Sequence, residues 1–238
     1  MATAEEKKMC NHCHTLNKGT SAMCINYQTV KAETLIEAFT TPIFDSPEWP
    51  EQVWQDYLAP IITGDGTIRQ ALVGTYGMVP KRKIPEGVKK YTTMNARIED
   101  VGARRSYSKA WREGQLCLVP LMAFYEPNWE TGKHIRYRIG MADESPFAVA
   151  GLWREWKEAD GTTSQSFTQL TMNADDHPVM KHFHRPGDEK RSLIIIPQDE
   201  WDEWLMCRDP ERARTFARPY PAGLMVADPW PLTNDGRM

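Results

Sequence analysis

The sequence predicts a single α+β domain built on a mainly antiparallel, barrel-like β-sheet with flanking helices. Three observations lead to this fold class. Strand-like segments outnumber helical ones, short turn signals such as Asp160-Gly161 join several of them, and strands and helices do not alternate regularly. The chain has 238 residues, of which 41% are apolar, and this is sufficient for one sizeable core.

Six segments have the composition and length of β-strands. Aliphatic, β-branched and aromatic residues dominate them, and turn residues bound most of them. The expected strands are 71–79, 115–125, 134–140, 147–153, 166–172 and 193–197. The turn signal Glu130-Thr131-Gly132-Lys133 separates the second strand from the third, which indicates a hairpin and therefore antiparallel pairing.

Five further segments have helical character and are expected to flank the sheet. They are residues 30–39, 50–58, 106–113, 175–183 and 198–206. Residues 1–22 differ from the rest because they are polar, contain His and Cys, and show no periodicity. We expect this segment to be an N-terminal appendage or propeptide, followed by one domain over residues 23–238, since no repeat or low-complexity tract divides the remainder.

Composition excludes several classes of protein. No apolar run approaches the roughly 18 residues of a membrane-spanning helix, and the first eight residues lack the apolar core of a secretory signal. Five cysteines, an odd number, agree with a reducing compartment, so a cytoplasmic protein is expected. The sequence contains no phosphate-binding glycine loop, His-Glu-x-x-His or Gly-x-Ser-x-Gly motif, and it indicates no cofactor.

Positive charge is concentrated in one region of the chain. The net charge is -3, yet residues 81–112 carry ten Lys or Arg side chains against three acids. The rest of the chain therefore carries -10, and an anionic partner would be attracted to this region rather than to the whole surface. For residues 81–90 taken alone, a solvated loop is the favoured explanation. A second, mixed cluster at 181–191 becomes relevant to such a partner only if it folds against the first.

Four segments contain residues that are able to carry chemistry. Taken alone, each has an ordinary explanation: Cys24 as a small buried residue, Asn95 as a turn residue, Glu126 as a partner for an arginine, and the histidines as polar surface. The segments are Met23-Cys24-Ile25-Asn26-Tyr27, Met94-Asn95-Ala96-Arg97, Phe124-Tyr125-Glu126, and residues 182–191 with His182 and His184.

As an ordered set, these segments resemble the SOS response-associated peptidase (SRAP) family over residues 23 to about 231. Three other stretches are similar to family strands: Tyr76-Gly77-Met78-Val79-Pro80, Ala150-Gly151-Leu152-Trp153 and Phe167-Thr168-Gln169-Leu170-Thr171. The resemblance implies a DNA-damage protein that recognises abasic sites in single-stranded DNA. It also implies covalent attachment to such sites through an N-terminal cysteine, peptidase-like or lyase-like activity, and association with the nucleoid in a bacterium.

The implied chemistry accounts for the residue types. An abasic site opens to an aldehyde, and a cysteine with a free α-amine is a 1,2-aminothiol. The amine forms an imine with the aldehyde, and the sulfur then adds to close a thiazolidine ring. At pH 7 the α-amine is roughly 15% unprotonated and the thiol only about 3% ionised, so neighbouring groups must manage protons.

The resemblance assigns four catalytic residues. Cys24 would be the nucleophile, and Asn95 would hold Cys24 or a sugar oxygen by hydrogen bonds. Glu126 would act as general acid and base for amine attack and loss of water. His184 would move the proton for sugar-ring opening and for reversal of the crosslink, with His182 as the alternative.

Four further residues are expected to contact DNA. Arg97 would clamp a phosphate with its planar fork, and Tyr76 would stack on a base. Arg191 matches the arginine that follows the family's histidine, and Asn26 stands where the family often has an arginine. The family also has a tryptophan at the positions of Tyr76 and Pro127, so this chain departs from two expected stacking surfaces.

The position of Cys24 departs from the family pattern, in which the cysteine follows the initiator methionine. Here 23 residues precede Cys24, so its α-amine is part of a peptide bond. Either Met23 is the true start, or residues 1–23 are removed by attack of Cys24 on the Met23-Cys24 bond. Met9-Cys10 is a rival start without resemblance to the family's opening, and Cys10-x-x-Cys13 has no obvious second ligand pair, so no metal site is expected.

Two other functions stay open at the level of the sequence. A non-covalent single-stranded DNA-binding module would keep the groove while Cys24 stays blocked. A protease acting in trans would use Cys24, Glu126 and His184 to turn over peptides. Only the crosslinking protein would give an abasic-DNA adduct that survives denaturation and disappears in Cys24→Ala.

Overall fold

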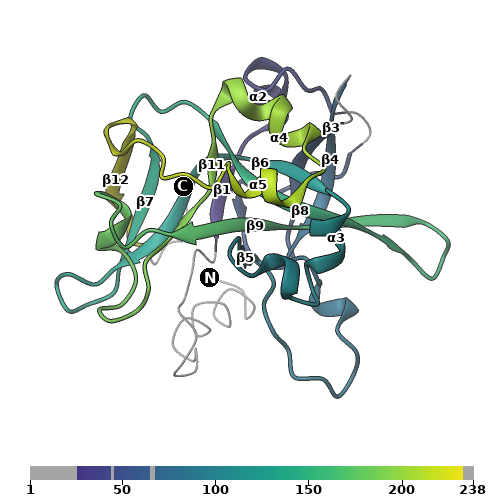
Figure 1. The fold of residues 1–238 in the computed structure, drawn as a ribbon, viewed down its shortest axis with the longest axis horizontal. Coiled ribbons are helices and arrows are strands. Elements are labelled where there is room, and N and C mark those ends of the chain that lie inside the picture. Colours follow the sequence, from purple (N-terminus) through teal and green to yellow (C-terminus); the bar gives the residue numbers. More distant parts are fainter. Residues whose placement is uncertain (1–25, 44–45, 65–67, 233–238) are drawn as a thin grey trace, which may run out of the picture.

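The computed structural model of the chain describes residues 26–43, 46–64 and 68–232. Within these residues strands dominate and the helices are short (Figure 1). The strands join into one twelve-stranded sheet in which most neighbours are antiparallel. The prediction of a single α+β domain with a mainly antiparallel, barrel-like sheet is therefore confirmed. None of the helices among the described residues is both long and apolar enough to cross a membrane.

Five strands close into a barrel. Neighbouring strands are antiparallel except for one parallel pair, β4 with β9, and the ring closes where Ile62 pairs with Leu118. The interior is tightly packed between β8 and β6, since a Cβ at Gly151 would lie 2.8 Å from the Cys117 sulfur. In order around the barrel, the strands are β3 (Leu58–Gly64), β4 (Arg69–Tyr76), β9 (Thr163–Asn173), β8 (Phe147–Lys157) and β6 (Leu116–Asn128).

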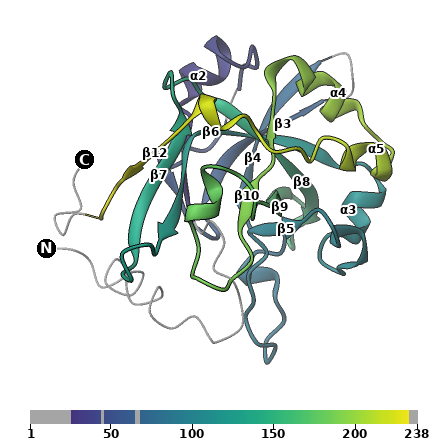
Figure 2. The same cartoon turned by 60° about the vertical axis from the view of Figure 1, so that its left-hand side comes forward.

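Seven shorter or peripheral strands extend this barrel within the described residues. β1 (Tyr27–Thr29) pairs with β6 and with β2 (Gln52–Val53), while β7 (Ile135–Met141) pairs with β6 and with β12 (Met225–Pro229). Figure 2 shows β7 and β12 side by side at the edge away from α3 and α5. β5 (Asn95–Arg97) and β10 (Arg191–Leu193) pair with β9, and β11 (Ile195–Ile196) pairs with β8.

Among the described residues, four short helices cover the outside of the barrel. Their apolar side chains, such as Leu35, Trp111 and Trp204, join the outer core cluster, and Phe39 stacks on Trp201 with ring centroids 4.8 Å apart. Burial of this face stabilises the helices, because helices this short are marginal on their own. The helices are α2 (Ala32–Glu37), α3 (Ser108–Arg112), α4 (Trp201–Met206) and α5 (Pro210–Arg214).

The apolar core is divided into a cluster outside the barrel and a cluster inside it. Alternate residues of β6 belong to opposite clusters, as the two-residue period of a strand requires. Leu116 and Leu118 pack outside with the helices, whereas Cys117 and Val119 pack inside. The near-continuous apolar composition of residues 116–125 therefore reflects a strand that is buried on both faces.

A β-bulge at Met122 changes which side of β6 faces inward. Consecutive residues of β1 pair with Ala123 and Leu121, so Met122 is an extra residue on β6. Leu121 belongs to the inner cluster before the bulge, and Phe124 belongs to it afterwards. Glu126 lies two residues beyond Phe124 and shares its face, so the bulge turns this carboxyl group toward the interior.

Two of the predicted helices are wrong. Residues 50–58 form β2 and a turn, in which Asp56 has a φ of 69°, because this segment pairs with β1 and then enters the barrel. Residues 175–183 form turns that end in the 3-10 turn Met180–His182. There the His177 ring nitrogen accepts bonds from the backbone amides of Val179 and Met180, at 3.1 Å each, in place of a helical ladder.

All six predicted strands are present. The last one, predicted at residues 193–197, is divided in the structure between the end of β10 and β11. The predicted helices at 30–39, 106–113 and 198–206 are also present in shortened form. β3 was not predicted, and it contains Pro60, a residue that cannot donate to a strand ladder. Proline is tolerated there because β3 pairs with β6 only at Ile62, which leaves the Pro60 nitrogen outside that ladder.

Candidate functional site

Glu126 and His184 meet at one end of the barrel. Glu126 lies near the end of β6, and His184 lies in the loop after the Met180–His182 turn; each is 3% exposed. The His184 Nε2 atom is 3.4 Å from Glu126 Oε2. The loop is fastened to β6, because the His184 amide donates to the Pro127 carbonyl at 2.9 Å and Phe183 forms a β-bridge with Asn128. One strand therefore fixes both groups.

His184 is held in an uncommon backbone conformation. Its φ of 66° lies in the left-handed region, which costs a non-glycine residue of order 1 kcal/mol and persists only where the surroundings enforce it. The Lys190 ammonium group donates to the carbonyl oxygens of His184 and Arg185, at 3.4 and 2.8 Å, and so braces the turn. Strain of this kind is typical of functional sites.

Burial lowers the pKa of His184 to about 4, and the nearby Lys190 charge acts in the same direction. The imidazole is therefore neutral at neutral pH and is able to accept a proton. Its contact with Glu126 joins a neutral ring to a carboxyl group rather than two full charges. His182, the predicted alternative, is 44% exposed and contacts Glu130 instead, with 2.5 Å between Nδ1 and Oε1.

The start of β1 lies beside this pair of side chains. Asn26 is 1% exposed, directly precedes β1, and accepts a hydrogen bond at its carbonyl oxygen from the Tyr125 amide at 3.3 Å. Tyr125 is the residue immediately before Glu126. The chain therefore approaches the Glu126 end of β6 as it is followed back toward its N-terminus. Cys24, the predicted nucleophile, lies outside the described residues.

Gln52 of β2 holds Asn26 in place. Its Oε1 atom accepts from the Asn26 amide at 3.3 Å and from the Arg136 guanidinium at 3.1 Å, and its Nε2 donates to the Tyr125 hydroxyl at 3.3 Å. Arg136 also lies 3.4 Å above the centre of the Tyr125 ring. Sequence reasoning missed Gln52 because the segment was assigned to a helix, where it would not have paired with β1.

Asn95 lies at the start of β5, in register with Gln169 of β9. It is half-buried, and its backbone oxygen accepts from the Tyr107 hydroxyl at 3.0 Å. Because β9 belongs to the barrel and β5 pairs with it, Asn95 lies beside β9. Its predicted contact with Cys24 stays a prediction.

Tyr76 has an interior position that does not support the stacking role expected of it. The side chain is fully buried, its ring stacks on Phe167 with centroids 5.4 Å apart, and the Tyr27 ring meets it edge-on at 5.2 Å. The Tyr76 hydroxyl donates to Gln169 Oε1 at 2.9 Å. A base would have to displace core side chains to reach this ring.

Arg191 is likewise committed to the protein. It is 1% exposed, forms two parallel bonds of 2.8 Å with the Glu99 carboxylate, and donates to Glu189 at 2.7 Å. Burial opposes its charge, yet these two carboxylates raise the pKa of Arg191 above its ordinary value. Arg191 is thus a structural residue that holds Glu99 and Glu189 together. A DNA phosphate could bind it only by replacing these two carboxylates.

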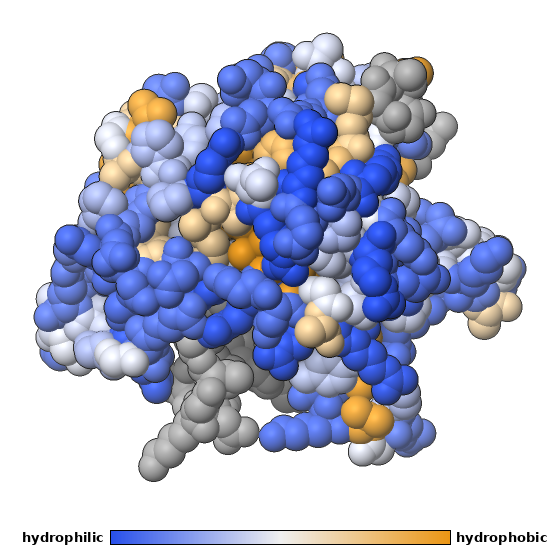
Figure 3. Space-filling view, in the orientation of Figure 1, coloured by the Kyte–Doolittle hydropathy of each residue, from blue (hydrophilic) through white to orange (hydrophobic). Residues whose placement is uncertain are grey.

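Arg97 joins the two positively charged segments of the chain. Its guanidinium lies 2.7 Å from the second oxygen of Glu189, and its side chain is 39% exposed. The segment 181–191 therefore folds against β5, which meets the condition set by the sequence. Lys89 and Lys90 of the same basic segment are exposed, whereas other members pair internally; Lys83, for instance, lies 2.7 Å from Glu158. Hydrophilic residues cover most of the face shown in Figure 3.

Trp129 forms a stacking column beside Glu126 and His184. The sequence did not reveal this column. Its ring is partly exposed, stacks on His134 at 5.5 Å, and carries the Arg185 guanidinium 5.0 Å from its centroid. Trp129 follows Glu126 by three residues, and Arg185 directly follows His184. An aromatic ring combined with an exposed guanidinium is a typical surface for an unpaired base. The signal that could have indicated this column is Trp129 itself, an aromatic residue close to Glu126 in the sequence.

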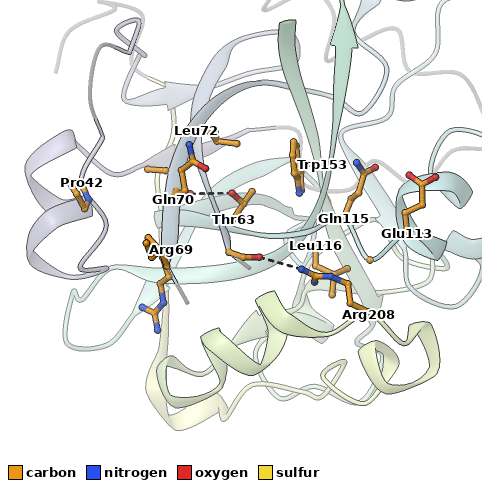
Figure 4. Close-up of a pocket in the computed structure, with 14 residues that line it drawn as sticks. Pro42, Thr63, Arg69, Gln70, Leu72, Glu113, Gln115, Leu116, Trp153 and Arg208 are labelled. Atoms are coloured by element: carbon orange, nitrogen blue, oxygen red, sulfur yellow. Dashed lines mark hydrogen bonds between the residues drawn. The ribbon is translucent and has the colours of Figure 1, made fainter. Parts of the chain in front are cut away.

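A hollow lies at the other end of the barrel. It has a volume of about 750 Å³ and contains none of the predicted site residues. Figure 4 shows Arg208 below it, with a hydrogen bond of 3.4 Å to the Gly64 carbonyl, and Gln115 and Leu116 on one side. Its lining residues are Pro42, Thr63, Gly64, Ile68, Arg69, Gln70, Ala71, Leu72, Glu113, Gly114, Gln115, Leu116, Trp153 and Arg208.

In the described part of the chain, no three His, Cys, Asp or Glu side chains are grouped to hold a metal ion. The Cys10-x-x-Cys13 motif lies outside that part. The predicted absence of a metal site there stays a prediction.

Comparison with known proteins identifies relatives of the chain. A crystal structure of a protein from Bordetella bronchiseptica is 34% identical, with a TM-score of 0.79 over 88% of this chain and 100% of that chain. Two others share the fold: one from Bacteroides thetaiotaomicron, at 20% identity and a TM-score of 0.66 over 89% and 93%, and a phage-related protein from Bordetella bronchiseptica, at 17% and 0.59 over 88% and 94%. No curated protein matches the chain.

A family model also matches, and it covers most of the chain. The model is that of the SOS response associated peptidase (SRAP), and its match extends over residues 23–230. This range includes every strand and helix described above, together with Glu126 and His184. The chain therefore belongs to the SRAP family, and this membership supports a DNA-damage-associated function, DNA binding and peptidase-like activity.

Proposed function

We propose that the protein senses abasic sites in single-stranded DNA and attaches to them covalently through Cys24. The observation that carries this proposal is the buried pair formed by Glu126 and His184, 3.4 Å apart, at the end of the barrel that β1 approaches. Only Ile25 separates Cys24 from Asn26, so chain connectivity alone keeps their Cα atoms within about 7 Å. The Asn26 carbonyl is bonded to the residue next to Glu126.

The proposed reaction condenses an aldehyde with an aminothiol. The α-amine of Cys24 attacks C1′ of the opened deoxyribose, the aldehyde oxygen leaves as water, and an imine forms. The Cys24 sulfur then adds to the same carbon and its proton moves to the nitrogen. One C–N bond and one C–S bond replace the C=O bond, and no oxidant or metal is needed.

Glu126 and His184 are suited to manage the protons of this reaction. A neutral imidazole can take the proton of the sugar hydroxyl during ring opening, and burial keeps His184 in that state at neutral pH. The Glu126 carboxyl group would take the amine's proton and return one to the departing oxygen. Their contact allows one proton to be shared between the two steps.

Side chains on two sides of this pair can hold the flanking strand. Arg97 is partly exposed on β5, and Arg185 stacks on the partly exposed Trp129. A base that stacks on the Trp129 column would contribute about 1–3 kcal/mol of binding free energy. Lys89 and Lys90 add positive charge without fixing sequence, which agrees with a lesion that any sequence can contain.

The α-amine of Cys24 must be free for this chemistry. Hydrolysis of the Met23-Cys24 bond, or initiation at Met23 followed by loss of that methionine, would release it. The match to the family begins at Met23, immediately before the cysteine, which supports Cys24 rather than Cys10 as the functional N-terminus. Intact-mass measurement of protein from its native host is expected to show a chain that starts at Cys24.

The proposal is tested with an abasic single-stranded oligonucleotide and a denaturing gel. Protein that begins at Cys24 should give a band that is retarded after denaturation and gains the mass of the DNA minus one water. Cys24→Ala should give no such band, and the matched control Cys207→Ala, which removes a free cysteine elsewhere in the same protein, should behave like the natural chain. Retention only in a native gel would replace the proposal with non-covalent binding, and peptide turnover without adduct would replace it with a protease.

A further inference from the structure

We propose that Gln169 is a further ligand-contacting residue of this site. Its side-chain amide would donate a hydrogen bond to an oxygen of the deoxyribose that lacks its base. The inference rests on the proposed function, because it names the part of the lesion that the barrel interior recognises. It adds a residue that selects the abasic nucleotide and performs no bond making or breaking.

The starting observation is a buried amide with an unused donor. Gln169 is fully buried on the inward face of β9, two residues from Phe167, a member of the inner cluster. Its Oε1 accepts from the Tyr76 hydroxyl at 2.9 Å, whereas its Nε2 has no hydrogen-bond partner in the described part of the chain. An unmade bond of this kind is costly, and native proteins rarely keep one without a reason.

The surroundings place this donor at the end of the barrel where the candidate site lies. Gln169 is in register with Asn95 on β5, and its backbone amide donates to the Met94 carbonyl at 2.9 Å. Its partner Tyr76 contacts the Tyr27 ring, which directly follows Asn26 in the chain. The amide is thus connected to two chain segments of the candidate site, directly to residues 94–95 and through Tyr76 to residues 26–27.

Tyr76 fixes the orientation of the amide. Its ring is held between Phe167 and Tyr27, and its hydroxyl engages the oxygen of Gln169, which leaves the NH₂ group as the free end. A rigidly oriented donor costs a ligand less ordering free energy than a mobile one does. The pair of polar groups inside an otherwise apolar cluster therefore forms a prepared contact rather than an accident of packing.

The chemistry of the donor selects a sugar oxygen as its acceptor. A deoxyribose without a base exposes oxygens at C1′ and C4′ and is small enough to enter the rim, whereas a base on the same sugar obstructs the approach. A buried donor also discriminates strongly, because it stays unpaired when the wrong ligand binds. Gln169 would in this way favour the lesion over intact nucleotides.

The experiment separates recognition from crosslinking. The probe is a single-stranded oligonucleotide with one borohydride-reduced abasic site, which keeps the sugar hydroxyls but cannot form an imine. Its Kd is compared with that of the same oligonucleotide without the lesion, for the natural protein and for the double variant Tyr76→Phe/Gln169→Leu. The natural protein should prefer the reduced site, and the double variant should lose about tenfold of that preference, as expected for one hydrogen bond.

Thermal unfolding distinguishes this role from a structural one. The double variant removes the unpaired donor together with its partner hydroxyl, so it should unfold at the same or a higher temperature than the natural protein. If the double variant does not fold, Gln169→Met, which is similar in volume, is measured in its place. An unchanged preference in a folded variant, or no preference in the natural protein, overturns the inference. A missing crosslink with unreduced abasic DNA overturns the proposed function alone.

Discussion

The two ends of the barrel have the same strands but different chemistry. At one end β4 finishes at Tyr76 and β6 finishes near Glu126, and buried polar groups gather there. At the other end β4 begins at Arg69 and β6 begins at Leu116, around a hollow of about 750 Å³. The end with this hollow is not the end with the paired carboxyl and imidazole groups.

The two ends differ in the state of their polar side chains: those at the hollow are paired, whereas burial perturbs those at the Glu126 end. At the hollow, Arg208 donates to the Leu205 and Cys207 carbonyls at 2.7 and 3.1 Å, and Arg69 pairs with Asp202 at 2.7 Å, so both guanidinium groups fasten the structure. At the Glu126 end, burial changes the pKa of His184 and leaves the donor of Gln169 unused. Perturbed and unpaired groups of this kind are typical of functional sites.

The largest expected effect compares one carboxylate from each end. Glu126→Gln keeps the size of the side chain but removes its ability to exchange a proton, so the rate of crosslinking to abasic DNA should fall by about 10²- to 10⁴-fold. The matched control is Glu113→Gln at the hollow, where the carboxylate is half-exposed and 3.9 Å from Lys109. Its rate should stay within about twofold of the natural protein. Equal losses in both variants would remove the distinction between the two ends.

A second prediction compares a buried arginine of the site's frame with an exposed one. Arg191→Met should lower the free energy of unfolding by about 2–3 kcal/mol, because it leaves Glu99 and Glu189 without their shared partner. Arg212→Met breaks a pair with Glu203 in which both side chains are more than half exposed, and it should cost less than about 1 kcal/mol. Urea unfolding measures both.

The same variants decide whether Arg191 contacts DNA. If Arg191 only supports the site, Arg191→Met should bind undamaged single-stranded DNA with the affinity of the natural protein. The affinities are measured without urea, at a temperature where both proteins are folded. A weaker salt dependence of binding in this variant would assign a phosphate contact to Arg191 and contradict the structural role.

Much of the fold could be predicted because its signals are local. The apolar run in residues 116–125 and the turn at residues 130–133 indicate a buried strand and a hairpin, and both are present. The helix predicted at 50–58 failed for a non-local reason: the segment is shaped by pairing with β1, about 25 residues away in the chain. Local spacing contains no information about that partner.

The candidate site was predictable in its residue types but not in its geometry. The resemblance singled out Glu126 and His184, yet the bulge at Met122 that turns Glu126 inward has no sequence signal. The burial of Tyr76 could not be foreseen either, because an aromatic residue at the end of a strand is compatible with a core or a surface position. The unused donor of Gln169 is a property of tertiary packing alone.

The smallest predicted effect is a change of stability with pH that comes from His184. The Glu126 end has this buried histidine, whereas no histidine lines the hollow. The pKa of His184 falls from 6.5 to about 4 on folding, so between these values the unfolded chain binds a proton that the folded chain does not. The resulting stability is fully present above about pH 6.5 and is lost as the pH falls toward 4. When the pH falls from about 7.5 to about 5.5, His184 should lower the free energy of unfolding by about 1 kcal/mol.

His184→Asn isolates this contribution, because asparagine tolerates the left-handed backbone and carries no titrating group. Urea unfolding of both proteins at the two pH values should show that the natural protein loses about 1 kcal/mol more than the variant does. If the two proteins lose the same amount, the imidazole titrates alike in the folded and unfolded states. In that case burial beside Glu126 does not lower the pKa of His184, and the imidazole would be mostly neutral only above about pH 6.5.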